Sequence, residues 1–261
     1  MIDLHCHILP NIDDGPSLVA DSVDMCKTAI TDGITDIIAT PHYLNGRHDV
    51  SLEKRDLYLE KINIFLHKSG LKLRIHPGLE VRLIPKLAKV TPNIHKLCIN
   101  KSRYILIELP DTIPHTLEEE LYEIQLKGYV PILAHPERYG YIQRNPDFLM
   151  HLVSTGVLSQ ITAQSLLGKF GENCRRCAEL LVHNRTAHFV ASDAHSCFDR
   201  PPLLSAAKDR ITHIAGHIEA QAMFEERPRA VLRNRPVDVK PPLPSTPRTI
   251  SDMVERLASL L

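Results

Sequence analysis

The chain has no excess charge of either sign. Its 261 residues include 31 Lys and Arg and 31 Asp and Glu, so the formal net charge is zero. Proteins that bind nucleic acid or anionic membranes through their surface charge carry a basic excess, which this sequence lacks. We therefore expect no nucleic-acid partner.

Long apolar runs are also missing. No stretch of the sequence reaches the roughly 20 apolar residues of a transmembrane helix. The N-terminus enters a strand-like pattern at once, without the basic segment and apolar stretch of a secretory signal peptide. We expect no membrane span and a cytoplasmic location.

Cysteines are too few and too scattered to predict a disulfide framework. The sequence has six of them, and without a secretory signal they are expected to be reduced thiols. Cys174 and Cys177 have the C-x-x-C spacing, but no second such pair completes a zinc site. We interpret both as ordinary residues of a helix over residues 172–183.

What the sequence does contain is a regular alternation of short β-rich runs and helical patterns. Strands are predicted at residues 2–4, 35–39, 71–76, 104–107, 129–133, 157–161 and 187–191. Helices are predicted at residues 17–32, 51–68, 85–89, 115–127, 146–154 and 172–183, and from residue 201 onwards. This order predicts an α/β fold in which helices cover parallel strands.

The last residues follow a different pattern. Residues 235–247 are Pro-rich and predict an extended connector. After the connector, apolar residues recur at helical spacing: Ile250, Met253, Val254, Leu257 and Leu260. We expect one domain at residues 1–235 and a connector with a C-terminal helix at residues 236–261. That helix would dock on the domain or on another subunit.

Metal-binding side chains follow most of the predicted strands, and the chain has fifteen histidines. Residues two apart in a strand point to the same face, so His5 and His7 converge, and so do Asp193 and His195. Four further candidates stand near the ends of β-like runs: His42, Glu80, Glu108 and His135. A parallel barrel brings the carboxyl ends of its strands to one rim. The sequence therefore predicts a polynuclear metal centre at that rim.

Two carboxylates need a separate argument. Asp14 lies in the loop after the first strand and is a candidate ligand; a turn residue ahead of Gly15 is the alternative. Glu108 stands in the apolar run Ile105-Leu106-Ile107-Glu108-Leu109. A carboxylate in such a run is costly to bury unless it is paired or binds a metal.

Two arginines closely follow candidate ligands. Arg138 is three residues past His135, and Arg200 is five residues past His195. A guanidinium group can hold a phosphate with two parallel hydrogen bonds. We expect both arginines to bind phosphate, and a surface salt bridge is the alternative for each.

Taken together, the motifs resemble those of the PHP (polymerase and histidinol phosphatase) superfamily. The matching stretches are His5-Cys6-His7, Leu9-Pro10-x-x-Asp13-Asp14-Gly15-Pro16, Thr40-Pro41-His42, Gly78-Leu79-Glu80, Ile107-Glu108, His135-Pro136-Glu137-Arg138-Tyr139 and Ser192-Asp193-Ala194-His195. Within this superfamily the chain is similar to the bacterial manganese-dependent tyrosine-protein phosphatases of capsule and exopolysaccharide loci. The resemblance runs from residue 1 to about residue 237.

The resemblance implies a distorted (β/α)7 barrel with its metal site at the carboxyl ends of the strands. It implies three divalent metal ions, Mn by the family pattern, although His and carboxylate ligands also accept Fe or Zn. The implied ligand sets are His5, His7, Glu80 and Asp193; Glu80, Glu108 and His135; and Asp14, His42 and His195. Arg138 and Arg200 would bind the phosphate.

The implied reaction is hydrolysis of a phosphate monoester. The implied substrate is a phosphotyrosine protein, a bacterial tyrosine autokinase of polysaccharide export. No cysteine is followed by five residues and an arginine, which is the spacing that cysteine-based tyrosine phosphatases need. A small-molecule phosphatase such as histidinol phosphatase, a PHP-type nuclease and a non-catalytic metal-binding subunit are the alternatives. A homo-oligomer is a further option that the sequence leaves open.

Overall fold

Every strand pairing in the described part of the chain is parallel. The computed structural model describes residues 1–46, 50–91 and 93–243. The smaller sheet has the order β1-β2-β4, with β1 (Ile2–Cys6), β2 (Asp36–Ala39) and β4 (Arg74–Pro77). The larger sheet has the order β3-β5-β6-β7-β8-β9, with β3 (His42–Tyr43), β5 (Glu80–Arg82), β6 (Tyr104–Glu108), β7 (Val130–Ala134), β8 (Leu158–Thr162) and β9 (Phe189–Ala191).

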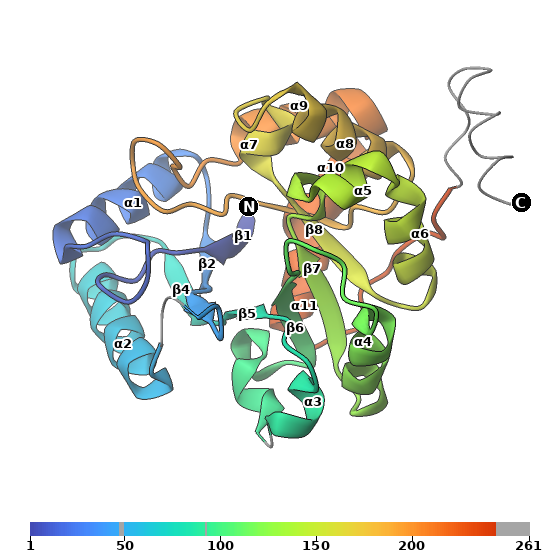
Figure 1. Ribbon diagram of the computed structural model, residues 1–261. Coiled ribbons are helices and arrows are strands. Elements are labelled where there is room, and N and C mark those ends of the chain that lie inside the picture. The colour runs from blue at the N-terminus through green and yellow to red at the C-terminus, as the bar shows by residue number, and fades with distance from the viewer. Residues whose placement is uncertain (47–49, 92, 244–261) are drawn as a thin grey trace, which may run out of the picture.

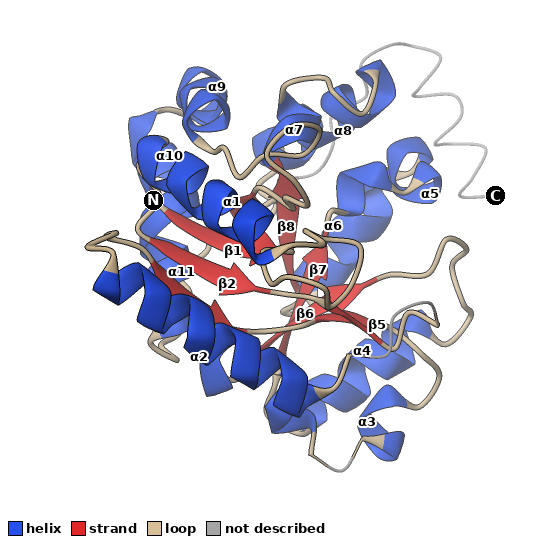
Figure 2. Ribbon diagram, turned by 90° about the vertical axis from the view of Figure 1, so that its left-hand side faces the viewer, coloured by secondary structure: helices blue, strands red, loops and turns tan. Residues whose placement is uncertain are grey.

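Helices connect the strands and lie around them (Figures 1 and 2). The longer ones are α1 (Val19–Thr31), α2 (Leu52–Lys68), α4 (Leu117–Leu126), α6 (Pro146–Ser154), α8 (Glu172–His183) and α9 (Ser205–Ala215). The shorter ones are α3 (Leu87–Val90), α5 (Gly140–Arg144), α7 (Ala163–Leu166), α10 (His217–Gln221) and α11 (Arg227–Leu232). No helix within the described residues is both long and apolar enough to span a membrane.

Each of the seven predicted strand regions contains a strand, and two short strands were not predicted. β3 follows β2 after Thr40 and Pro41, and β5 follows β4 after Gly78 and Leu79. Pro41 has no N–H group to donate to a neighbouring strand, so the ladder is interrupted there. A Cβ at position 78 would overlap the side chain of Ile38, so only glycine allows this close approach.

The predicted start of the last long helix is wrong. The sequence predicted a helix from Pro201 onwards, but α9 begins at Ser205. A proline disfavours helical backbone at the residue before it. Pro202 therefore keeps Pro201 out of a helix, and the chain turns helical only after both prolines.

The outer strands of the two sheets are joined by a contact between β1 and the segment after β9. Asp193 N donates to His5 O, and His7 N donates to Ala194 O, both at 2.8 Å. The buried Asp3 carboxylate strengthens this contact by accepting the Ser192 N–H at 2.9 Å and the Ser192 hydroxyl at 2.5 Å. Residues 5–7 and 193–195 are thereby held side by side.

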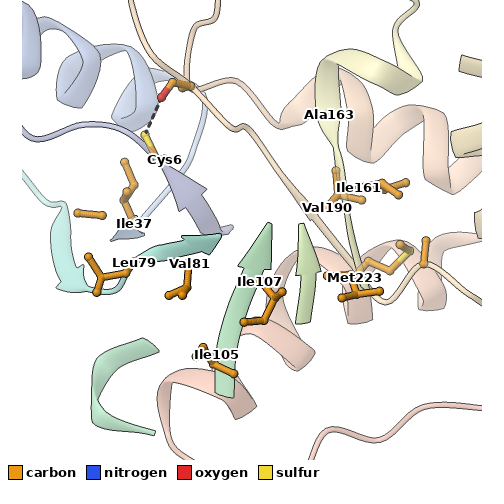
Figure 3. Packing of buried hydrophobic residues seen from close by; sticks show 14 of the residues in the cluster. Cys6, Ile37, Leu79, Val81, Ile105, Ile107, Ile161, Ala163, Val190 and Met223 are labelled. Carbon is orange, nitrogen blue, oxygen red and sulfur yellow. Dashed lines mark hydrogen bonds between the residues drawn. The ribbon is translucent and has the colours of Figure 1, made fainter. Parts of the chain in front are cut away.

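Strands β6, β7 and β9 are buried on both faces. In β6, Ile105 and Ile107 belong to the larger core cluster, drawn in Figure 3, whereas Tyr104 and Leu106 belong to the smaller one. Successive strand residues point to opposite faces, so each face of β6 contributes to a different cluster. Such burial explains why the strands read as continuous apolar runs in the sequence.

The C-x-x-C pair lies in the core, as expected for ordinary residues of a helix. Cys174 and Cys177 are free and belong to the buried face of α8 together with Ala178, Leu181 and Val182. Burial raises the pKa of Cys174 to about 11 and that of Cys177 to about 12. Neither thiol is therefore an activated thiolate at neutral pH.

Part of the predicted connector packs on the domain. Val237 and Val239 contact the smaller core cluster, and Leu243 N donates to Asn184 O at 2.8 Å. The predicted C-terminal helix with Ile250, Met253, Val254, Leu257 and Leu260 lies outside the described residues.

Phe189→Ala is expected to destabilise the fold strongly. Phe189 is among the largest fully buried side chains and lies in the smaller core cluster. Replacement by alanine leaves a cavity, which costs about 3–5 kcal/mol of unfolding free energy. Urea denaturation measures this change. Phe65→Ala on α2, where Phe65 is 43% exposed, is the control and should cost much less. Equal losses in the two variants would contradict the core assignment.

Candidate metal centre

The nine predicted ligands come from strand ends and from the loop after β1. Six lie at or just beyond the carboxyl end of a strand: His5 and His7 at β1, Glu108 at β6, His135 after β7, and Asp193 and His195 after β9. His42 and Glu80 begin β3 and β5, where they are direct neighbours in the parallel pairing. Asp14 lies in the loop between β1 and α1.

Ligand atoms of four residues lie close to one another. His5 Nε2 and His7 Nε2 are 3.1 Å apart. Glu80 Oε2 is 3.4 Å from both nitrogens, and Asp193 Oδ1 is 3.4 Å from His5 Nε2 and 3.5 Å from His7 Nε2. Ligand atoms about 2.1 Å from a common ion are roughly 3.0–3.4 Å apart in octahedral or tetrahedral geometry. Those of His5, His7 and Asp193 form a candidate site for one divalent cation, whereas Glu80 lies beside it and belongs to other candidate clusters.

The ring nitrogens of His5 and His7 that point away from this centre have hydrogen-bond partners. His5 Nδ1 is 2.9 Å from Oε1 of Gln160 on β8, and His7 Nδ1 is 2.7 Å from Oδ2 of Asp13. Because both partners are assigned as acceptors, each Nδ1 carries the proton. Burial lowers the pKa of both rings, but Glu80 and Asp193 at His5 and Asp13 at His7 outweigh it and raise both pKa values. A cation would therefore take each Nε2 lone pair by displacing a proton.

The loop that carries Asp13 and Asp14 lies tightly against the end of β1. Asp13 Oδ1 accepts the Gly15 N–H, and Asp13 Oδ2 accepts the His42 N–H, both at 3.0 Å. A Cβ at position 15 would overlap the carbonyl oxygen of His7. Only glycine at this position brings the two carboxylates so close to the histidines.

A second group of side chains forms around Asp14. Its Oδ1 atom is 3.3 Å from His195 Nε2 and 3.5 Å from His42 Nε2. His195 Nδ1 is 3.0 Å from the carbonyl oxygen of Asp193, to which it donates, so Nε2 has the lone pair. Together with His7 these residues form a cluster whose ligand atoms all lie within 4.8 Å of one another.

Glu80 lies between the groups. Its Oε1 atom is 2.7 Å from His135 Nε2, whereas its Oε2 atom is 2.9 Å from His42 Nδ1. A carboxylate whose two oxygens face different histidines can bridge two cations. Two candidate clusters contain it, one with His5 and His135 and one with His42 and Glu108. Glu108 and His135, predicted to share a metal, fall in different clusters.

Two buried polar atoms of the site make no hydrogen bond among the described residues. Arg82 Nη1 donates to Oε1 of Glu108 at 2.9 Å, whereas Oε2 of Glu108 has no hydrogen-bond partner among the described residues. His135 Nδ1 likewise has no hydrogen-bond partner within the described part of the chain. Buried polar atoms are costly when unpaired, and a ligand is one explanation for them. The histidine nitrogens and carboxylate oxygens gathered here are the ligand types that bind divalent cations.

The electrostatics of the site favour the uptake of positive charge. Burial raises the pKa of Glu80, but His5 and His135 outweigh it and hold the pKa well below its usual range. Burial lowers the pKa of His42, but the hydrogen bonds with Asp14 and Glu80 outweigh it and raise the pKa to about 9. The carboxylates thus need positive charge nearby, which a divalent cation supplies in place of protons.

His195 is already neutral. Burial, helped by the nearby His7 ring, lowers the pKa of His195 to about 4. At neutral pH its Nε2 atom therefore offers a lone pair without losing a proton first.

Both predicted arginines contact one carboxylate oxygen. Arg138 Nη1 and Arg200 Nη2 are each 2.5 Å from Oδ2 of Asp193. The other oxygen of Asp193 faces His5 and His7. Both guanidinium groups are partly exposed, so they remain accessible to a phosphate at the rim.

Two residues of the site have unusual backbone angles. His135 has φ 36° and Asp193 has φ 50°, both in the left-handed region that favours glycine. Non-glycine residues in this region cost on the order of 1–3 kcal/mol each, and they gather at functional sites. The surrounding contacts therefore hold both side chains in place at some cost to stability.

Comparison with known families identifies the chain. Residues 1–233 match the family described as capsular polysaccharide synthesis, CpsB/CapC. The chain belongs to the CpsB/CapC family. A relative from Bacillus subtilis strain 168, named tyrosine-protein phosphatase YwqE, is 40% identical over 245 residues, which cover 94% of this chain and 96% of the relative.

Solved structures agree with this membership. One comes from work on YwqE from Bacillus subtilis and CpsB from Streptococcus pneumoniae, described as metal-dependent tyrosine phosphatases. It matches with a TM-score of 0.88 and 37% identity, over 94% of this chain and 100% of that chain. Histidinol phosphate phosphatase from Lactococcus lactis shares the fold, with a TM-score of 0.54 and 16% identity, over 83% of this chain and 95% of its own. The CpsB/CapC chain thus has the parallel α/β fold of these phosphatases.

All nine predicted ligands and both predicted arginines of this CpsB/CapC chain lie at one site. Sequence reasoning missed the residues that orient them. In the sequence, Asp13 stands out only as part of a motif, and no motif contains Gln160 or Asp3. Both Gln160 and Asp3 are fully buried polar residues of strands. A polar residue within a predicted strand is the sequence feature that could have indicated them.

Asp13→Ala is expected to weaken metal binding. Without Asp13, His7 loses the acceptor that orients its ring and fixes its tautomer. The loss of such a partner typically lowers metal affinity about 10- to 100-fold. Titration of the metal-free protein with Mn²⁺ in a calorimeter measures the change. Asp24→Ala, on the exposed side of α1, should bind as the wild type does. Unchanged affinity in Asp13→Ala would show that Asp13 does not support a ligand.

Proposed function

We propose that this CpsB/CapC protein is a metal-dependent protein-tyrosine-phosphate phosphatase. The observation that carries the proposal is Asp193, whose carboxylate connects a group of metal-type ligands to two arginines. Metal ligands beside a pair of guanidinium groups suit the hydrolysis of a phosphate ester. The names of the YwqE and CpsB relatives support the same activity.

We further propose three divalent metal ions, with Mn as the native metal and Fe or Zn as alternatives. His5, His7, Glu80 and Asp193 would hold the first. Glu80, Glu108 and His135 would hold the second, and Asp14, His42 and His195 the third. The clustering of these side chains supports the sets in part: His5, His7 and Asp193 cluster without Glu80, and Glu108 and His135 lie in different clusters.

Bound divalent cations supply a water molecule of lowered pKa and stabilise negative charge on the phosphoryl oxygens. The side chains of this protein would bind and orient the substrate. Arg138 and Arg200 would bind and orient the phosphoryl group beside Asp193. Glu108, through its bond with Arg82, keeps its free oxygen turned toward the site. The phenol of tyrosine, with a pKa near 10, is a better leaving group than an alkyl alcohol.

We also propose that the scaffold of this site is a distorted (β/α)7 barrel at residues 1–235, followed by a connector and tail helix at residues 236–261. The contact between β1 and residues 193–195 supports it, because it links the outer strands of the two sheets. The continuity of β2 with β3 and of β4 with β5 supports it on the other side.

The physiological substrate that we propose is a bacterial tyrosine autokinase of polysaccharide export, dephosphorylated in the cytoplasm. The family description, capsular polysaccharide synthesis, supports this role. The neutral net charge gives no support to a nuclease, which needs a basic surface for DNA. Self-association through the tail is a further option.

The test is a comparison of substrates and metals. Metal-free protein is reloaded with Mn²⁺, Fe²⁺ or Zn²⁺ and assayed on a phosphotyrosine peptide and on histidinol phosphate. We expect the peptide to be the better substrate, and activity to be absent without metal. His5→Ala should lose nearly all turnover because the first metal loses a ligand. Hydrolysis of histidinol phosphate alone would favour the small-molecule phosphatase, and activity that persists with chelator would reject metal dependence.

A further inference from the structure

An aromatic ring lies beside both arginines. The centroid of the Phe170 ring is 4.7 Å from Arg138 Cζ and 6.0 Å from Arg200 Cζ. Phe170 belongs to the segment between α7 and α8, which follows the carboxyl end of β8. This segment therefore borders the same rim as the candidate ligands, although no sequence motif includes Phe170.

The arginine pair needs more than one negative partner. Both guanidinium groups contact a single oxygen of Asp193, so two positive charges lie close together and share one carboxylate. The other oxygen of that carboxylate faces His5 and His7, where a bound cation would draw on the same negative charge. Repulsion between the arginines opposes this arrangement, so a further group that attracts both would help to hold it.

The face of Phe170 is such a group. The π-system of an aromatic ring carries negative charge on its face and attracts a guanidinium within about 6 Å. The glycines on either side, Gly168 and Gly171, have φ angles of 83° and 91°. Residues with side chains rarely adopt these angles, so the backbone that presents the ring depends on both glycines.

We propose that Phe170 is a positioning residue that holds Arg138 and Arg200 in the arrangement that binds the phosphoryl group. The proposal rests on the proposed phosphatase function. Phe170 acts through the arginines and not through the substrate. Its loss should therefore weaken binding of any phosphate group, including inorganic phosphate, and leave the metal ions in place.

The test uses two substitutions of Phe170. Phe170→Leu keeps an apolar side chain but removes the aromatic face, whereas Phe170→Tyr keeps the face. For Phe170→Leu we expect KM for para-nitrophenyl phosphate and the dissociation constant of inorganic phosphate each to rise about tenfold. The metal content should not change. Phe170→Tyr should stay within about twofold of the wild type in both measurements.

Phe65→Leu, the same substitution on the surface helix α2, is the matched control and should leave both constants unchanged. Thermal melting establishes that each variant is folded. The proposal is overturned if Phe170→Leu binds phosphate as the wild type does, or if Phe170→Tyr is as impaired as Phe170→Leu. Failure of the proposed function gives a different result from failure of this proposal. If the protein is not a phosphatase, the wild type itself hydrolyses no ester. Calorimetry with inorganic phosphate would then still compare the variants.

Discussion

The rest of the site depends on the interactions of the Asp193 carboxylate. Its Oδ1 atom faces His5 and His7, and its Oδ2 atom accepts from Arg138 and Arg200. Its backbone N–H donates to the carbonyl of His5, so the same residue joins β1 to the segment after β9. A shift of Asp193 would therefore disturb the histidine group, the arginine pair and the strand contact together. Its left-handed backbone angle shows that these contacts outweigh a local strain.

Much of this arrangement could be predicted from the sequence because it follows from local periodicity. The spacing of His5 and His7 places both rings on one face of a strand, and parallel strands bring distant strand ends together. The parallel α/β fold and the phosphatase family are confirmed, and the nine candidate ligands lie in candidate clusters that share residues. The assignment of each ligand to a particular metal stays a prediction, and the separation of Glu108 from His135 shows where it is weakest.

The residues that orient the site could not be predicted, because their roles depend on contacts between distant segments. Gln160 is 155 residues from His5 in sequence, yet its side chain fixes the His5 tautomer. Phe170 has no motif and is informative only beside Arg138 and Arg200. The short strands β3 and β5 depend on the breaks at Pro41 and Gly78, which periodicity does not detect. In each case the physical cause is a close approach in space that leaves no local pattern.

Metal content is the most direct measurement of the central claim that the ligand clusters hold cations. Metal-free protein is reloaded with Mn²⁺, dialysed, and analysed for bound metal per chain by plasma mass spectrometry. We expect about three ions per wild-type chain, and fewer in Asp193→Ala, because the first proposed metal loses a ligand. A folded wild-type protein that retains no metal after reloading would contradict the account.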